Sequence, residues 1–172
     1  MNKTKIKNMS LYALFTAIIA ACAWISISTP FGVNLSFSLF GVCLASCCLG
    51  LKGGLLSTVT YILLGVTGLP VFSQFSGGIG VLLGPSGGFI WGFLLVAVLC
   101  GVATNIKNQP LSYLLCIISV LICHISGVIQ FYFVTNNSIL ASFLYASLPF
   151  LFKDVLLAIL AYIISKKIKS QF

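Results

Sequence analysis

Long apolar runs with short gaps between them constrain the fold of this chain more than any other feature. A membrane-spanning helix needs ~20 apolar residues, because all of its backbone hydrogen bonds must be made internally in the hydrocarbon core. The runs are continuous, whereas the strands of a membrane barrel would alternate apolar and polar residues. We therefore predict an all-α integral membrane bundle of six transmembrane helices, at residues 9–28, 35–50, 53–68, 89–105, 111–134 and 140–165.

Composition and length indicate a single membrane domain. Hydrophobic residues make up 60% of the chain and charged residues 6%, against ~45–50% and ~25% in soluble domains. Six spans with short connections use nearly all of the 172 residues, which leaves no room for a soluble catalytic domain. We predict one transmembrane domain, residues 1–172, in a multi-pass membrane protein.

The lysines are distributed unevenly along the predicted topology. With six helices, eight of the nine basic residues fall on one side of the bilayer, and the connections on the other side carry none. Cytoplasmic loops are enriched in Lys and Arg, so we expect both termini in the cytoplasm. Topology then explains the net charge of +8, and we expect no nucleic-acid partner. The eight residues are Lys3, Lys5, Lys7, Lys52, Lys107, Lys166, Lys167 and Lys169.

Seven cysteines raise the question of a metal site or disulfides, and Cys43, Cys47 and Cys48 even recur at helical spacing. All seven lie in apolar runs, where free Cys behaves as a small buried hydrophobe. We therefore predict no disulfide, no metal and no other cofactor. The segment that ends at Cys22 resembles a lipoprotein signal peptide, but apolar residues continue beyond it, so we expect a retained first span.

The gap at residues 69–88 differs from the others. It combines six glycines and two prolines with aromatic and aliphatic residues. Glycine permits close backbone approach, and the apolar residues are not typical of a solvated linker. We predict an ordered glycine-rich external loop between the third and fourth helices, packed over the bundle as a lid or binding loop.

The ninth lysine, Lys153, precedes Asp154, which is the one acidic residue of the chain, inside the last apolar run. Ionised side chains are costly within a membrane and mark functional sites. Pro149 lies in the same run, where it should kink the helix next to the charged pair. We therefore predict that Lys153 and Asp154 belong to a ligand pocket.

A long motif surrounds the glycine-rich gap. Residues 65–72, GVTGLPVF, and 76–89, SGGIGVLLGPSGGF, closely resemble the signature of the BioY family, GLPVF followed by GxGxLxGPTGGY. Residues 35–50, LSFSLFGVCLASCCLG, resemble that family's ITLQTLAVLLAGLLLG, and residues 148–154 resemble its LPFxxxD segment. The resemblance thus extends over nearly the whole chain.

The resemblance implies a biotin-binding S-component of an energy-coupling factor transporter, in the cell membrane of a prokaryote. Such a protein docks on a transmembrane coupling protein driven by two cytoplasmic ATPases, and it is not itself an enzyme. In agreement, the sequence has no phosphate-binding G-x-x-x-x-G-K-[ST] motif. Two positions depart from the family: Ser38 replaces the usual Gln, and Leu157 replaces the usual Lys one turn after the acid.

Biotin has a ureido ring with two N–H donors, an apolar ring and chain, and a carboxylate. We predict that Asp154 accepts the ureido N–H groups and that Lys153 meets the ligand carboxylate. His124 is expected instead to be a hydrogen-bonded residue in helix packing. The other predicted ligand-binding residues are aromatic side chains that sandwich the rings and residues of the motif and its surroundings, namely Phe72, Phe75, Tyr61, Trp91, Gln74, Gly78, Ser86 and Ser38.

A second functional surface is predicted on the first span. Ala13, Ala17 and Ala21 repeat every four residues, and small residues at this spacing permit close helix approach in lipid. The resemblance implies that this alanine seam contacts the coupling protein, although from the sequence it could equally pack internally.

Three alternatives remain open at this point. The nearest is an S-component for another vitamin. Ser86 and His124 also resemble the dyad of a rhomboid intramembrane protease, but the chain has no Arg for that family's loop motif. A self-sufficient carrier would show an inverted repeat, and none is convincing.

Overall fold

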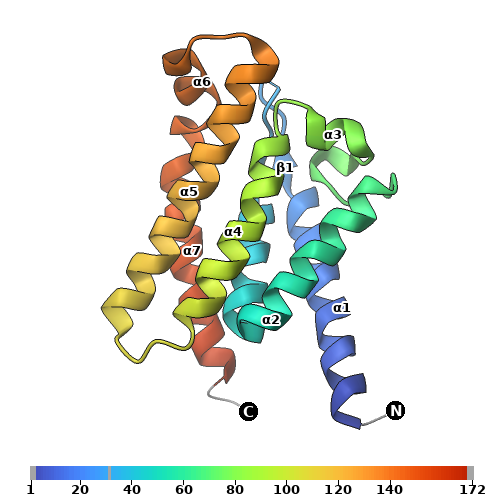
Figure 1. Cartoon of the computed structure of the whole chain (residues 1–172), viewed down its shortest axis with the longest axis vertical. Coiled ribbons are helices and arrows are strands. Elements are labelled where there is room, and N and C mark those ends of the chain that lie inside the picture. The colour runs from blue at the N-terminus through green and yellow to red at the C-terminus, as the bar shows by residue number, and fades with distance from the viewer. Residues whose placement is uncertain (1–2, 31, 170–172) are drawn as a thin grey trace.

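The computed structural model describes residues 3–30 and 32–169, which form a bundle of helices (Figure 1). Its helices are α1 (Lys3–Trp24), α2 (Ser38–Val66), α3 (Ile79–Leu83), α4 (Gly87–Ala103), α5 (Gln109–Thr135), α6 (Ile139–Ala146) and α7 (Leu148–Lys169), with a 3-10 turn η1 (Ser73–Phe75). Of these, α1, α2, α5 and α7 are long and apolar enough to cross a membrane, and α4 is a shorter apolar helix. The predicted all-helical membrane architecture is confirmed at this level.

Helix α2 contains both the second and the third predicted spans. It is broken at Gly50, whose φ of 73° and ψ of −175° lie in a region that is essentially restricted to glycine. In Figure 1 the chain reverses at this point, so α2 forms two arms. A Cβ at Gly101 of α4 would lie 2.5 Å from the Leu51 Cα, so α4 packs closely against the break.

The last predicted span is also divided. Helix α6 ends at Ala146 and α7 begins at Leu148, with Ser147 at φ −122° and ψ −53° between them. Proline lacks a backbone N–H and is tolerated in the first turn of a helix, which is where Pro149 lies. The predicted kink is therefore present, but it divides 140–165 into two helices.

A short β-ribbon was not predicted. Strand β1 (Ser26–Ile27) pairs antiparallel with β2 (Leu35–Ser36), in the register Ser26↔Ser36 and Ile27↔Leu35. The predicted spans 9–28 and 35–50 therefore extend too far into the connection between α1 and α2. This ribbon places β2 directly before α2, beside the cavity described below.

The glycine-rich segment packs onto the bundle instead of extending from it. Phe72 and Leu82 are each 1% exposed, and the Gln130 side chain of α5 donates to the carbonyls of Leu82 and Gly84 at 2.7 and 2.9 Å. A Cβ at Gly65 would lie 2.0 Å from the Phe72 ring. The segment contains η1 and α3, so it is more helical than the predicted loop.

Figure 1 shows both termini at the end of the bundle where α4 connects to α5.

The seven cysteines are free, and the Sγ atoms of Cys47, Cys100 and Cys116 lie within 4.8 Å of one another. These buried thiols from α2, α4 and α5 occupy the small spaces where the three helices pack together.

Candidate ligand-binding site

A cavity lies where β2 and the glycine-rich segment meet α2, α4 and α7. It encloses about 580 Å³ of space, counting the part that is open to the outside. Its lining consists of Val33, Asn34, Leu35, Ser36, Ser38, Leu39, Tyr61, Phe72, Ser73, Ser86, Phe89, Ile90, Phe93, Phe150, Lys153 and Asp154.

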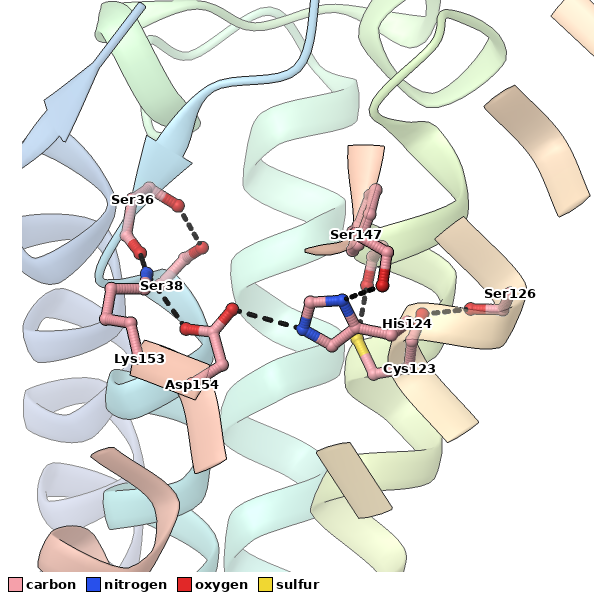
Figure 2. A network of polar contacts seen from close by, with 9 residues as sticks. Ser36, Ser38, Cys123, His124, Ser126, Ser147, Lys153 and Asp154 are labelled. Carbon is pink, nitrogen blue, oxygen red and sulfur yellow. Dashed lines mark hydrogen bonds and ion pairs between the residues drawn. The ribbon is translucent and has the colours of Figure 1, made fainter. Parts of the chain in front are cut away.

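Asp154 is the buried charged group of this cavity. It is 7% exposed, and its two oxygens have different partners (Figure 2). The Oδ2 atom lies 3.3 Å from Nε2 of His124, and Oδ1 lies 2.9 Å from Nζ of Lys153. The Lys153 contact is an ion pair without hydrogen-bond geometry, so Oδ1 is left as a buried acceptor with no hydrogen bond.

Lys153 links this carboxylate to the β-ribbon. Its ammonium donates to the Ser36 carbonyl at 2.5 Å and lies 5.3 Å from the centroid of the Phe37 ring. The side chain of Lys153 is 23% exposed and that of Asp154 is 9% exposed. The ammonium is therefore the outer charge and the carboxylate the inner charge of the pair.

His124 holds the carboxylate from the opposite side. It is 3% exposed, its Nδ1 lies 2.9 Å from the Ser147 Oγ, and its ring makes an edge-to-face contact with Phe89 at 5.6 Å. Ser147 is the residue between α6 and α7, so the division of the last span places a hydroxyl against the imidazole (Figure 2). The predicted packing role of His124 is present, and its contact with Asp154 was not predicted.

Aromatic and small polar side chains form the remaining walls. Tyr61 and Phe72 meet edge-to-face with centroids 5.4 Å apart, and both are buried. The hydroxyls of Ser36 and Ser38 lie 2.7 Å apart, and the Asn34 amide donates to the Ser73 Oγ at 3.2 Å. An apolar enclosure with a few directed polar groups is typical of a pocket for a small, partly polar molecule.

The structure brings six of the ten predicted ligand-binding residues to the cavity, namely Asp154, Lys153, Phe72, Tyr61, Ser86 and Ser38. The other four lie outside its lining. Gln74 donates to the carbonyl and hydroxyl of Ser26. Phe75 is 63% exposed and stacks on Trp24.

Gly78 and Trp91 are the other two residues outside the cavity. Gly78 precedes α3 with φ +94°, and a Cβ there would meet nothing within 4 Å. Trp91 is 47% exposed, because it lies on the outer side of α4 while its neighbours Ile90 and Phe93 line the cavity. Hydropathy does not distinguish these two sides, since a membrane helix is apolar all round.

Several lining residues were missed by the sequence analysis. Ser36 comes from the ribbon and Asn34 directly precedes its second strand, Phe89 and Phe93 come from α4, and Phe150 comes from the first turn of α7. Phe150, Phe89 and Ser36 could have been suspected, because all three belong to segments quoted for the family resemblance. Nothing in the sequence marks Asn34.

The protease alternative is not supported by this geometry. Ser86 lines the cavity, but the two ring nitrogens of His124 contact Ser147 and Asp154. The imidazole is therefore already engaged on both sides, and it is not placed as a base for Ser86.

Comparison with known proteins gives one consistent result. The model of the BioY family matches residues 1–172. "Biotin transporter BioY" of Thermotoga maritima is 37% identical over 158 residues, covering 91% of this chain and 92% of that relative. "Probable biotin transporter BioY" of Pyrococcus horikoshii is 36% identical over 168 residues, covering 97% and 99%.

A solved structure shares the architecture. It is the crystal structure of the S-component for biotin from an ECF-type ABC transporter. Its TM-score with this chain is 0.91 at 28% identity, and the match covers 100% of this chain and 95% of that one.

Proposed function

The chain belongs to the BioY family, and we propose that it is the membrane subunit that binds biotin for ATP-driven uptake, not an enzyme. One observation of the structure carries the proposal. Asp154, whose Oδ1 is a buried acceptor without a hydrogen bond, lines a cavity that Lys153 also lines. A buried acceptor with no partner costs ~1–3 kcal/mol; the ion pair with Lys153 offsets part of that cost, and a ligand with N–H donors would offset the rest.

The chemistry of biotin matches this arrangement. The ureido N–H groups would donate to Asp154, and the apolar ring system would lie against Tyr61 and Phe72. The chain of biotin separates its two ends by more than the 2.9 Å between the Lys153 ammonium and Asp154 Oδ1. The terminal carboxylate would therefore meet Lys153 once this side chain swings outward from Asp154. Charge-assisted hydrogen bonds are roughly twice as strong as neutral ones, so both ends of the ligand would be held by strong contacts. Ser38 and Ser86 would contribute hydroxyls to the same cavity.

We also propose the orientation of the chain in the membrane. The six spans are α1, the two arms of α2, α4, α5, and α6 with α7, and they form one S-component domain over residues 1–172. Both termini lie at one end of the bundle, together with the lysine-rich connections, which supports placing that end in the cytoplasm. The cavity and the glycine-rich segment then face outward, in the cell membrane of a prokaryote.

We propose that the alanine seam is the surface that contacts the transmembrane coupling protein. Two cytoplasmic ATPases would drive that coupling protein. Ala13, Ala17 and Ala21 are exposed, whereas the buried residues of α1 are Thr16, Ile19, Ala20 and Ala23. The seam therefore points away from the helices of its own chain. That position favours a partner in the membrane over internal packing, because small residues permit close backbone approach.

The decisive experiment is a titration of labelled biotin against the detergent-purified chain and against Asp154→Asn. The amide keeps the shape of the side chain but removes its charge and replaces one acceptor with a donor. Saturable binding by the wild type, weakened at least about tenfold in the variant, supports the proposal. A stable wild-type protein that binds another vitamin and not biotin would replace it.

A further inference from the structure

A second hollow lies at the lysine-bearing end of the bundle, away from the biotin cavity. It encloses about 600 Å³, counting the part that is open to the outside, between the α4–α5 connection and the last turns of α7. Its lining consists of Thr104, Ile106, Lys107, Gln109, Tyr162, Ser165, Lys166 and Lys169.

Three ammonium groups share this hollow without an acidic side chain to neutralise them. Lys107, Lys166 and Lys169 are exposed, and Lys166 Nζ lies 5.7 Å from the centroid of the Tyr162 ring. The one acidic side chain of the sequence, Asp154, is already paired with Lys153 and lies twelve residues before Lys166 on α7, about 18 Å along the helix axis. The hollow therefore carries a local positive charge that an anion from outside the chain can balance.

The surroundings of the hollow indicate what kind of anion this is. Gln109 adds an amide donor beside the lysines, and Tyr162 is an aromatic residue of the type enriched at membrane interfaces. Next to the hollow, α5 and α7 present the exposed apolar side chains of Leu111, Leu114 and Ile163. Phosphate oxygens can accept hydrogen bonds from the lysines and Gln109. Acyl chains can pack against the exposed apolar side chains.

We propose that this hollow binds the phosphate of an anionic phospholipid from the leaflet at the lysine-bearing end. Basic pockets between transmembrane helices are suited to such headgroups. The phosphate would lie among the three ammonium groups, and the acyl chains would lie along α5 and α7. The site is separate from the biotin cavity and does not depend on the proposed function.

The test compares phosphatidylglycerol with phosphatidylcholine of the same acyl chains, measured by native mass spectrometry of the detergent-purified chain. Wild type should retain phosphatidylglycerol preferentially, and the variant Lys107→Gln/Lys166→Gln/Lys169→Gln should bind it at least about tenfold more weakly, since each lysine near a charged surface contributes ~1 kcal/mol. A wild type that does not distinguish the two lipids overturns the proposal.

The matched control is Lys3→Gln/Lys5→Gln/Lys7→Gln, which removes the same charge from the start of α1, outside the hollow. It should retain phosphatidylglycerol within about twofold of wild type. An equal loss in both triple variants would mean that overall charge attracts the lipid, and it would overturn the site. Inorganic phosphate is the competing ligand: if it displaces phosphatidylglycerol at equal concentration, the hollow is a site for free phosphate and the lipid assignment is wrong.

Discussion

Replacing His124 tests whether this residue holds Asp154 in its ligand-binding orientation. The substitution His124→Leu removes the contact to Asp154 Oδ2 and the contact to Ser147. A hydrogen bond to a charged group contributes ~1.5–3 kcal/mol. At 3.3 Å this bond is longer than the usual N–H···O range of ~2.7–3.2 Å, so its contribution should lie at the lower end. That free energy is the most that re-ordering the carboxylate can cost on binding, and because ~1.4 kcal/mol is a factor of ten, biotin affinity should fall by up to about tenfold.

The reason for a loss of affinity lies in the two oxygens of the carboxylate. While His124 occupies Oδ2, Oδ1 stays beside the ammonium of Lys153, and Lys153 and Asp154 both line the cavity. In His124→Leu the carboxylate can rotate away, and the ligand must order it again on binding. His124→Gln retains an N–H donor on a side chain of similar reach and should recover part of the affinity. Labelled-biotin titration and thermal unfolding of each detergent-purified variant are the measurements.

A matched control separates positioning from helix packing. Ser126 lies on the same helix and donates to the Gly88 carbonyl at 2.6 Å, without a contact to Asp154. Ser126→Ala should lower the melting temperature and leave biotin affinity nearly unchanged. If His124→Leu behaved in the same way, with a lower melting temperature and wild-type affinity, the positioning argument would be refuted.

Three further predictions follow from the proposed site and orientation. Lys153→Ala should weaken free biotin at least about tenfold and a biotin amide much less, because only the free acid carries the carboxylate; equal losses for both ligands would contradict this role. Ala17→Trp should abolish co-purification with the coupling protein while isolated biotin binding stays normal, and a loss of folding would show that the seam packs internally. A cysteine introduced at Ile79, which is 55% exposed, should react with an impermeant thiol reagent on intact cells, and the wild-type chain gives the background labelling. Labelling only after permeabilisation would show that the topology is the reverse of the one proposed.

The sequence predicted those parts of the architecture that leave a local mark. The two arms of α2 were separable because Lys52 lies in the short gap between the apolar runs 35–50 and 53–68. The break near Pro149 was expected from the missing backbone N–H. The ribbon was missed because Ile25 and Ile27 continue the apolar pattern of α1, so nothing local indicates that the chain has left the helix.

The site was predictable only where its residues differ from their surroundings. Lys153 and Asp154 stand out as charges in an apolar run, and both line the cavity. Among aromatic residues that contrast is lost: Trp91 was predicted and lies outside the lining, whereas Phe93, two residues later, belongs to it. The contact between His124 and Asp154 joins residues thirty positions apart in the sequence. It depends on how α5 packs against α7, and the local sequence pattern does not show that packing.

The network around Asp154 explains how a membrane bundle can retain a carboxylate and still bind a ligand with it. Burying an unpaired charge costs several kcal/mol, and His124 and Lys153 both reduce that cost. They do so unequally, because His124 satisfies Oδ2 by a hydrogen bond while Lys153 gives Oδ1 an ion pair without hydrogen-bond geometry. A third contact that fully satisfied Oδ1 from within the chain would stabilise the empty protein and remove the gain on binding. The unsatisfied oxygen is therefore the part of the network that a ligand with two N–H groups can complete.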